Sequence, residues 1–204
     1  RIWNLLIWAR AVLEDYRMKD RGEILKRKID GYLKKERLFK DDEHKKLEKS
    51  FLIKSRKNFT VANLLFNISE QEDIKKLLNL ASDFEMYDWV IIVSYYAMYT
   101  SALAALAKLG FKSKSHAATI AVLEHHYIPE KKDKNNTKTL EQKDIHKLVK
   151  AYAMSEHLIT KLIQTKTRRE TAQYDATPSI TREMAKTSLD DADEFITKIE
   201  EILG

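Results

Sequence analysis

The sequence predicts an all-α fold, and three observations lead to that expectation. The 204 residues include only four glycines and two prolines, so the residues that favour turns and hairpins are scarce. Charged residues make up 33% of the chain and hydrophobic residues 44%, a balance typical of amphipathic helices. Apolar residues also recur at three- and four-residue steps along most of the chain. All-β and Rossmann architectures are therefore disfavoured.

Residues 1–40 are expected to form an N-terminal helical extension in front of a bundle domain over residues 43–204. The apolar residues of its first half recur at helical spacing: Leu5, Trp8, Ala9, Val12, Leu13 and Tyr16. Two tryptophans within eight residues require a partner surface. That surface belongs either to the body of this chain or to another subunit or domain, and the pattern leaves both open.

Two further helices are expected before residue 110. A polar break at residues 40–44 precedes an apolar set that runs from Leu47 to Phe66. The most apolar part of the chain, residues 89–109, is expected to be the central helix, and Gly110 fits a helix C-cap. One stripe of it carries small side chains that let a second helix approach closely: Ala97, Ser101, Ala104 and Ala105.

Three helices are expected after Gly110. A short helix over residues 117–127 ends before Pro129, and the polar, basic residues 130–139 form an exposed loop. A long helix with apolar positions from Ile145 follows, and Pro178 cannot continue it unbroken. Ser179 or Thr181 can cap the last helix. Its expected apolar face is Ile180, Met184, Leu189, Ala192, Phe195, Ile196, Ile199, Ile202 and Leu203.

The net charge of +6 is unevenly distributed. Residues 1–40 carry 12 basic and 6 acidic groups, whereas residues 181–204 carry 3 basic and 7 acidic groups. This polarity fits a basic surface for nucleic acid or for acidic partners, and it fits equally well a pairing of the two ends within one molecule or a dimer. Scattered surface charge is the ordinary explanation.

Several chemistries are excluded or disfavoured by residue content. The absence of cysteine excludes disulfides, thiolate nucleophiles and Cys-ligated zinc, and it is typical of a reducing cytoplasm, where we expect the protein to act. The six histidines show no HExxH spacing, and no P-loop or dinucleotide fingerprint occurs. We therefore predict no metal and no cofactor. The N-terminal apolar stretch is interrupted by Arg10, so no membrane-spanning segment is expected there.

A cluster of arginines lies near the end of the long helix, just before Pro178. Arg168 and Arg169 can hold a phosphate through paired N–H groups, and Tyr174 can stack on a base or donate its hydroxyl. In the ordinary alternative, the arginines complement the helix dipole and are neutralised by Glu170 or Asp175. Spacing alone does not decide between these roles.

Three segments of this chain resemble the signature motifs of a known family. They are Ser94 to Tyr99 on the central helix, Lys108 to His116 after it, and Arg169 to Tyr174. Together they are similar to the motifs of the HEPN (higher eukaryote and prokaryote nucleotide-binding) family, in its stand-alone prokaryotic branch. The resemblance covers about residues 43–204. It implies an antiparallel bundle of four main helices with a shorter fifth, forming a homodimer in which the two Arg-containing helices face a shared cleft.

The resemblance also implies candidate site residues. Nuclease members of the family place a histidine four to six residues after an arginine, and this chain has no histidine there. A glutamine cannot act as a general base, and the reference pKa of tyrosine, about 10, makes Tyr174 a poor one. The catalytic candidates are Arg169, Tyr174 and His116, of which His116 fits a capping or cleft-lining role better. The expected binding residues are Arg168, Arg169, Tyr174, Asp175 and Tyr95.

Three functions remain open at the level of sequence. The first is a non-catalytic module that binds RNA or a nucleotide in the dimer cleft. The second is a metal-independent endoribonuclease toxin, and the third is a protein-interaction module. Family resemblance also implies a minimal nucleotidyltransferase as partner, in a toxin–antitoxin or defence system.

Overall fold

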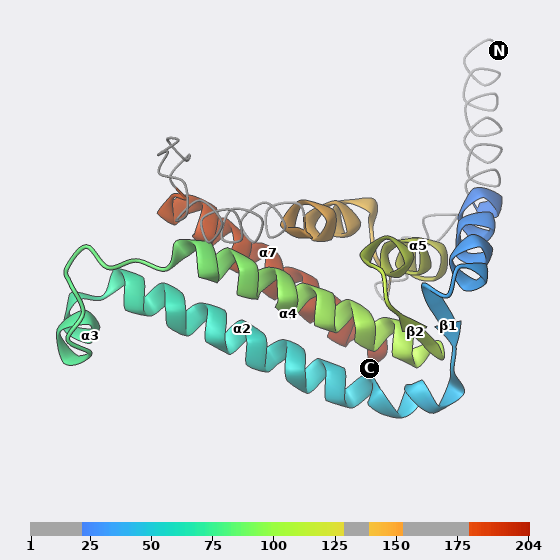
Figure 1. Cartoon of the computed structure of the whole chain (residues 1–204), viewed down its shortest axis with the longest axis horizontal. Helices are drawn as coiled ribbons and strands as arrows, with labels where there is room; N and C mark the ends of the chain where they lie inside the picture. The colour runs from blue at the N-terminus through green and yellow to red at the C-terminus, as the bar shows by residue number, and fades with distance from the viewer. Residues whose placement is uncertain (1–21, 129–138, 153–179) are drawn as a thin grey trace, which may run out of the picture.

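The computed structural model describes residues 22–128, 139–152 and 180–204, and these parts of the chain are mostly helical (Figure 1). This confirms the predicted helical bundle, with one small sheet added. Helices also cover residues 22–34 and 142–152. The remaining elements, in chain order, are β1 (Leu38–Lys40), the 3₁₀ helix η1 (Asp42–Leu47), α2 (Glu48–Glu70), α3 (Glu72–Leu77), α4 (Tyr87–Lys108), β2 (Phe111–Ser113), α5 (His116–Tyr127) and α7 (Arg182–Leu203).

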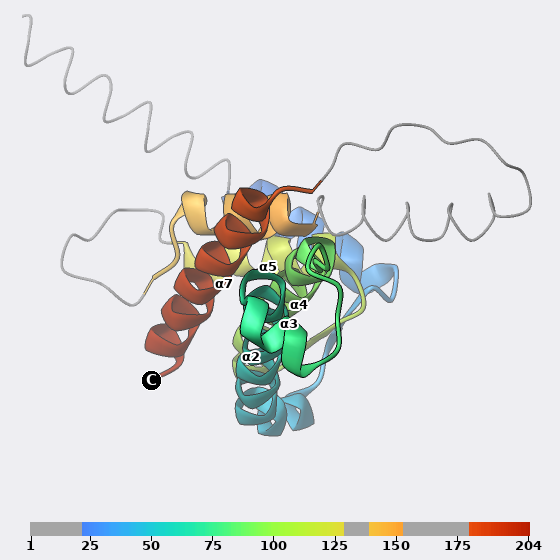
Figure 2. The same cartoon turned by 90° about the vertical axis from the view of Figure 1, so that its left-hand side faces the viewer.

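Helix α4 is the centre of the bundle and packs against both α2 and α7. Figure 1 shows α2 running antiparallel to α4, whereas α7 runs in the same direction as α4. The carboxyl ends of α4 and α7 meet where Lys108 Nζ donates to the carbonyl oxygen of Leu203 at 3.0 Å. Figure 2, turned by 90°, shows α7 beside α2 and α4, and buried residues of all three helices share one apolar cluster.

The predicted stripe of small residues allows α2 to lie close to α4. Ala97, Ala104 and Ala105 are fully buried, so no large side chain separates the two backbones. The Ser55 hydroxyl on α2 donates to the Ala97 carbonyl oxygen on α4 at 2.8 Å. A buried serine that reaches the backbone of the neighbouring helix requires such a close approach. The expectation of close helix packing is therefore confirmed.

Helix α7 begins and packs largely as its sequence pattern predicts. Thr181 is the N-cap, and its hydroxyl accepts a hydrogen bond from the Met184 amide at 3.3 Å. Met184 itself was expected on the apolar face but is 37% exposed. The residues that are buried along this helix are Ala185, Leu189, Ala192, Phe195, Ile196, Ile199 and Leu203.

Strands β1 and β2 form a two-stranded antiparallel sheet that the sequence did not predict. Each strand has only three residues, which is too short to show an alternating pattern. Leu38 and Phe111 are 1% and 8% exposed, respectively, so one face of the sheet is anchored in the core.

Gly110 ends α4 and allows the chain to enter β2. Its φ of +75° lies in the left-handed region, which confirms the expected glycine cap. A Cβ atom at this position would lie 2.9 Å from Oδ1 of Asp42. The carbonyl oxygen of Gly110 also accepts a hydrogen bond from the Asp41 amide at 2.8 Å. The sheet can therefore close only with a residue that tolerates both constraints.

The described part of the predicted extension packs against the bundle. Leu25 and Ile29 of the helix at 22–34 belong to the same core cluster as Tyr95 and Phe195. Strand β1 lies within the predicted extension and pairs with β2 of the bundle domain. Residues 22–40 therefore contribute to the common core, while the proposed domain boundary near residue 40 stays a prediction.

A second, smaller apolar cluster closes the opposite end of the bundle. It joins Ala62 and Phe66 of α2 to Val90 of α4 and Leu189 of α7. Beside it, Glu70 accepts hydrogen bonds from the Tyr87 hydroxyl at 2.6 Å and from Nε of Arg182 at 2.5 Å. One carboxylate thus joins α2, α4 and α7.

Helix α4 is long and apolar enough, by length and composition alone, to cross a membrane. However, 78% of its most apolar window is buried inside the protein. The packing of α2 and α7 on α4 accounts for this burial. The hydrophobicity of α4 is therefore explained by its place in the core.

Candidate functional site

The structure brings together two of the residues predicted to form a site. Tyr95 on α4 and His116 at the start of α5 are in direct contact. The other predicted binding or catalytic residues lie outside the described residues, together with the lysines of the basic loop: Arg168, Arg169, Tyr174, Asp175, Lys131, Lys132, Lys134 and Lys138.

Helix packing determines where Tyr95 and His116 meet. Tyr95 is only 2% exposed, because α4 is covered on several sides. Its hydroxyl is hydrogen-bonded to Nδ1 of His116. A tyrosine hydroxyl buried in a core needs such a partner, and the histidine ring supplies one from the neighbouring helix. The hydrogen bond therefore fixes the histidine relative to the central helix.

Two further tyrosines cover the His116 ring. Tyr152 is stacked on it, with the ring centroids 4.5 Å apart and an interplanar angle of 17°. Tyr99 lies 4.2 Å from the same ring with an angle of 36°. We refer to Tyr95, Tyr99, His116 and Tyr152 as the tyrosine–histidine cluster. It joins α4, α5 and the helix at 142–152. The cleft-lining role of His116 stays a prediction.

Short polar residues fix the backbone around His116. The Ser113 hydroxyl accepts from the Ser115 amide at 3.2 Å and donates to the Ser115 carbonyl oxygen at 2.9 Å. The Thr119 hydroxyl donates to the hydroxyl oxygen of Ser113 at 3.0 Å. Ser115 is the N-cap residue of α5, with an extended backbone. The direction in which His116 leaves the helix is therefore set by β2 and the first turn of α5.

The tyrosines of the cluster are better suited to hydrogen bonding and stacking than to general-base catalysis. Burial raises the pKa of Tyr99 above its usual value, while a hydrogen bond with Thr119 opposes this shift. A phenol with a raised pKa stays neutral at pH 7. Tyr99 can therefore donate a hydrogen bond or stack, but it is a poor general base.

Metal chemistry finds no support in the described ranges. Among residues 22–128, 139–152 and 180–204, no three His, Asp or Glu side chains are grouped as metal ligands require. The adjacent His125 and His126 pack edge to face, with ring centroids 4.8 Å apart. The prediction that the chain uses no metal and no cofactor stays a prediction.

A second polar site, which the sequence did not predict, lies between α2 and α7. Arg56 donates from Nε and Nη2 to the two carboxylate oxygens of Glu200, at 2.8 and 2.6 Å. Its Nη1 donates to Asp193 at 2.8 Å, and Nη2 also donates to the Thr197 hydroxyl at 3.0 Å. Hydrogen bonding to Glu200 is the main cause that raises the pKa of Arg56 above its usual value. Arg56 therefore links the two helices.

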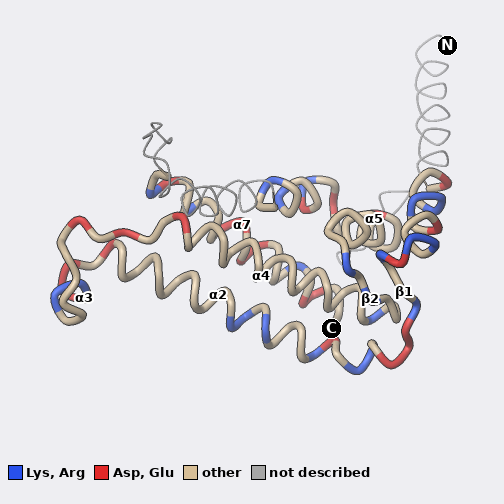
Figure 3. Tube along the Cα trace, in the orientation of Figure 1, with Lys and Arg blue, Asp and Glu red and all other residues tan. Residues whose placement is uncertain are grey.

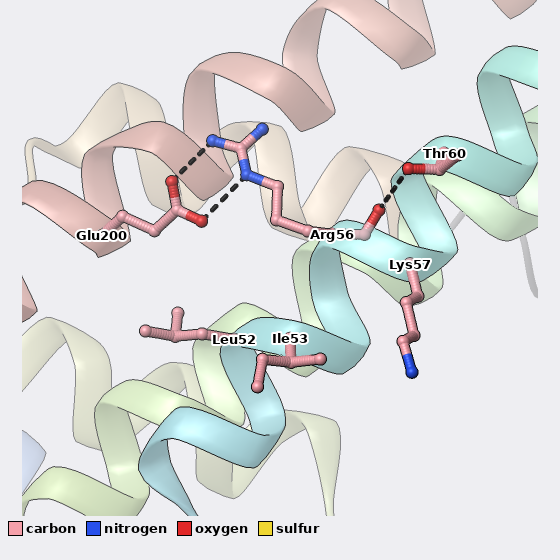
Figure 4. Close-up of a pocket in the computed structure, with 6 residues that line it drawn as sticks. All are labelled: Leu52, Ile53, Arg56, Lys57, Thr60 and Glu200. Atoms are coloured by element: carbon pink, nitrogen blue, oxygen red, sulfur yellow. Dashed lines mark hydrogen bonds and ion pairs between the residues drawn. The ribbon is translucent and has the colours of Figure 1, made fainter.

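Arg56 and Glu200 also line a surface pocket of about 370 Å³ (Figure 4). The other lining residues are Leu52, Ile53, Lys57 and Thr60. The figure shows the guanidinium group turned toward Glu200, while Lys57 extends away from it. Because each of the three nitrogens of the Arg56 guanidinium already donates to a protein acceptor, this pocket fits a structural link better than a ligand site.

Sequence reasoning missed Arg56, Tyr99 and Tyr152 as members of these two sites. The spacing of Tyr95 and Tyr99, one helical turn apart, is a signal that can place both rings on one face of α4. The acidic composition of α7 also signals a basic partner. Neither pattern, however, identifies the partner residue on another helix.

The bundle and its tyrosine–histidine cluster define a helical domain in which a histidine at a helix start contacts a tyrosine of the central helix. The HEPN domain family matches residues 68–202, and the chain belongs to this family. The match begins later than residue 43, where the resemblance was expected to begin. Helix α2, which lies mostly before the match, nevertheless packs as part of the same bundle. No curated protein matches the chain.

Proposed function

We propose that this HEPN-domain protein binds RNA or a nucleotide, as a homodimer, without cleaving it. The family match over residues 68–202 is the observation that supports the proposal most, since it spans both the tyrosine–histidine cluster and residues 168–175. Nucleotide- and RNA-related roles are general in this family. In this proposal Arg168 and Arg169 hold phosphate groups, and Tyr174 and Asp175 line the cleft, while Tyr95, which is buried, acts by holding His116 in place.

The surroundings of His116 favour binding over catalysis. Tyr99 and Tyr152 lie against its ring, and Nδ1 is hydrogen-bonded to Tyr95. A general acid or base has to reach the proton that it transfers. A ring held in this way acts as a positioning residue that keeps α5 and the cleft wall in place. The departure of residues 172–176 from the nuclease motif supports the same choice.

An RNA cleavage assay in EDTA distinguishes the proposed module from the endoribonuclease. Purified full-length protein is incubated with labelled single-stranded RNA in excess chelator. We expect the RNA to stay intact and to be retained on a filter with the protein. Cleavage that disappears in Arg169→Ala and in His116→Ala would overturn the proposal and establish the nuclease.

Binding variants test the cleft directly. Arg169→Ala should weaken RNA retention about tenfold, because a charge-assisted hydrogen bond contributes about 1.5 kcal/mol. Lys186→Ala removes one positive charge from an exposed position on α7 and serves as the control. The proposal fails if both variants bind RNA as the unmodified protein does.

The proposed partners follow from the same family membership. HEPN domains commonly form dimers and pair with nucleotidyltransferases, so we propose a minimal nucleotidyltransferase as partner in a toxin–antitoxin or defence system. A cytoplasmic location is part of this proposal. Retention of the nucleotidyltransferase but of no RNA would favour the third function, a protein-interaction module.

A further inference from the structure

Among the described residues, those at 22–40 and 111–114 carry most of the cations that have no salt-bridge partner. Among the described residues, four exposed lysines elsewhere have no salt-bridge partner: Lys49, Lys54, Lys57 and Lys150. Eight such cations, all exposed, lie within residues 26–40 and 112–114: Lys26, Lys28, Lys34, Lys35, Arg37, Lys40, Lys112 and Lys114. Figure 3 shows Lys and Arg positions along the helix at 22–34 and around β1 and β2.

The acidic groups nearby are few and are partly engaged. Residues 22–40 contain three carboxylates, Glu23, Asp30 and Glu36, and Glu23 pairs with Arg27 at 3.2 Å. Asp41 follows Lys40 directly, and the carboxylates of η1 pair within η1: Asp42 with Lys45, and Glu43 with Lys46. The positive field of this end is therefore only partly screened by the protein itself.

One face of the sheet gathers three of the cations around an aromatic ring. Phe39 is paired with Lys112, and side chains directly opposite each other share a face. Arg37 directly precedes β1 and Lys114 directly follows β2, and the alternation of side chains, continued by one residue, places both toward that face. Nζ of Lys114 lies 4.7 Å from the centre of the Phe39 ring. We refer to Arg37, Phe39, Lys112 and Lys114 as the basic ribbon face.

Two of these cations are neighbours just beyond the end of the sheet. Leu38 is paired with Ser113, and past that last pair the Lys114 amide donates to the Arg37 carbonyl oxygen at 2.9 Å, which holds the two residues across from each other. Like charges opposite each other across two strands oppose folding. The described residues supply no carboxylate that pairs with either one. An anion bound between them would relieve the repulsion.

We propose that the basic ribbon face binds the phosphate backbone of single-stranded RNA. Arg37, Lys112 and Lys114 contact phosphates, and Phe39 offers an aromatic surface near which a base can stack. This inference rests on the proposed function for its ligand, but it assigns a surface separate from residues 168–175. It deepens that function by adding a second strand-holding site in each protomer.

The chemistry of the face favours RNA over a lipid surface. Membrane-bound basic elements also insert several apolar side chains into the bilayer. On the helix at 22–34, Ile24 is the one large aliphatic side chain that is exposed, with an exposed fraction of 43%. The contacts that this end offers are therefore mainly with phosphate and with an aromatic base.

The test is a salt titration of single-stranded RNA binding by the full chain in EDTA. The ribbon variant carries Arg37→Gln, Lys112→Gln and Lys114→Gln. Its matched control carries Lys49→Gln, Lys54→Gln and Lys57→Gln, which remove the same charge from exposed positions on α2. Each phosphate contact on a single strand contributes about 0.7 to the slope of log affinity against log salt. We expect the ribbon variant to lose about 2 from that slope and at least about tenfold in affinity at 50 mM salt.

The control variant should bind within about twofold of the unmodified protein at 50 mM salt. Ribbon and control variants that lose equal affinity, or a ribbon variant with unchanged slope, would overturn the inference. If Arg169→Ala abolishes retention while the ribbon variant binds normally, the ribbon inference falls and the proposed function stands. If the unmodified protein retains no RNA, both fall. Binding to phosphatidylserine vesicles in place of RNA would likewise overturn the assignment to RNA.

Discussion

Two charged regions of this protein use their ions in opposite ways. Between α2 and α7, Arg56 is held by Glu200, Asp193 and Thr197, so its charge is matched by acceptors. On the basic ribbon face, Arg37 lies opposite Lys114, with no carboxylate paired to either within the described residues. The first arrangement stabilises the fold, whereas the second opposes it. Charge that opposes folding calls for a role outside folding, and RNA binding provides one.

The acidic composition of the C-terminal helix is explained by the first arrangement. Lys147 of the helix at 142–152 contacts Asp191 at 3.2 Å and also pairs with Glu194. Lys198 contacts Asp144 at 3.5 Å. In the described residues, the acidic end of the chain is thus paired with α2 and with residues 142–152, whereas the cations of residues 22–40 remain largely free.

Matched phenylalanine substitutions should separate the two regions most strongly. Phe195 on α7 is 1% exposed, so Phe195→Ala should lower the free energy of unfolding by about 4 kcal/mol. Phe39 is only partly buried, and Phe39→Ala should cost about 1 kcal/mol. Urea unfolding measures both. Equal losses would contradict the distinction between a structural and a binding region.

Removing Arg56 should have the next largest effect. Arg56→Met leaves the carboxylates of Glu200 and Asp193 without their partner, and we expect a loss of about 1–2 kcal/mol. This value is discounted for solvent screening, because the Arg56 side chain is 36% exposed. Lys54→Met is the control, because it removes a charge from α2 at a position that has no salt-bridge partner among the described residues. A control that destabilises as much as Arg56→Met would show that the link has no special role.

The pH dependence of stability offers a third test on the paired side. The Tyr87 hydroxyl, and then Arg182, lower the pKa of Glu70 below its usual value, while the same hydrogen bond raises the pKa of Tyr87 to about 12. A lowered carboxylate pKa stabilises the folded protein above the unfolded pKa of about 4.3, and this stability is lost as the pH falls through the folded pKa. Tyr87→Phe should therefore cost about 1 kcal/mol at pH 6 and less at pH 3.

Thermal melts of the protein and of Tyr87→Phe at pH 6 and pH 3 measure this difference. We expect the two melting temperatures to approach each other as the pH falls. A difference in melting temperature of the same size at pH 6 and at pH 3 would mean that the hydrogen bond does not depend on ionised Glu70.

The smallest expected effect lies on the basic ribbon face and has the opposite sign. Arg37→Glu replaces the like-charge pair with an attractive pair across the strands, so stability should rise by about 0.5 kcal/mol. The melting temperature should rise by about 1–2 °C. RNA affinity should fall in the same variant. A lower melting temperature would indicate that Arg37 stabilises the fold by contacts of its own.

Local signals in the sequence predicted much of the bundle. Gly110 was identified as a cap, and Thr181 as one of two candidate caps with Ser179, because their residue types suit those positions, and the small residues of α4 predicted close packing. The strands were missed, since three residues are too few to define a period. Met184 was placed on the buried face by spacing alone, although the surroundings of the first turn of α7 leave it exposed.

The candidate site was less predictable than the fold. Family resemblance singled out Tyr95 and His116, which the structure brings into contact, but Tyr152 comes from a helix distant in sequence. The partners of Arg56 lie more than a hundred residues away in the sequence. No local spacing pattern can identify a contact between residues so far apart. The opposition of Arg37 and Lys114 depends on the register of two strands that the sequence did not reveal. Contacts of this kind arise from tertiary packing.

The most direct test of the central claim is the affinity of the full chain for single-stranded RNA, measured in EDTA at 50 and 200 mM salt. A protein that binds phosphates through several cations should retain intact RNA at the lower salt, with log affinity falling by about 3 or more for each tenfold rise in salt. RNA that is degraded, that is not retained at 50 mM salt, or that binds equally at both concentrations would contradict the account.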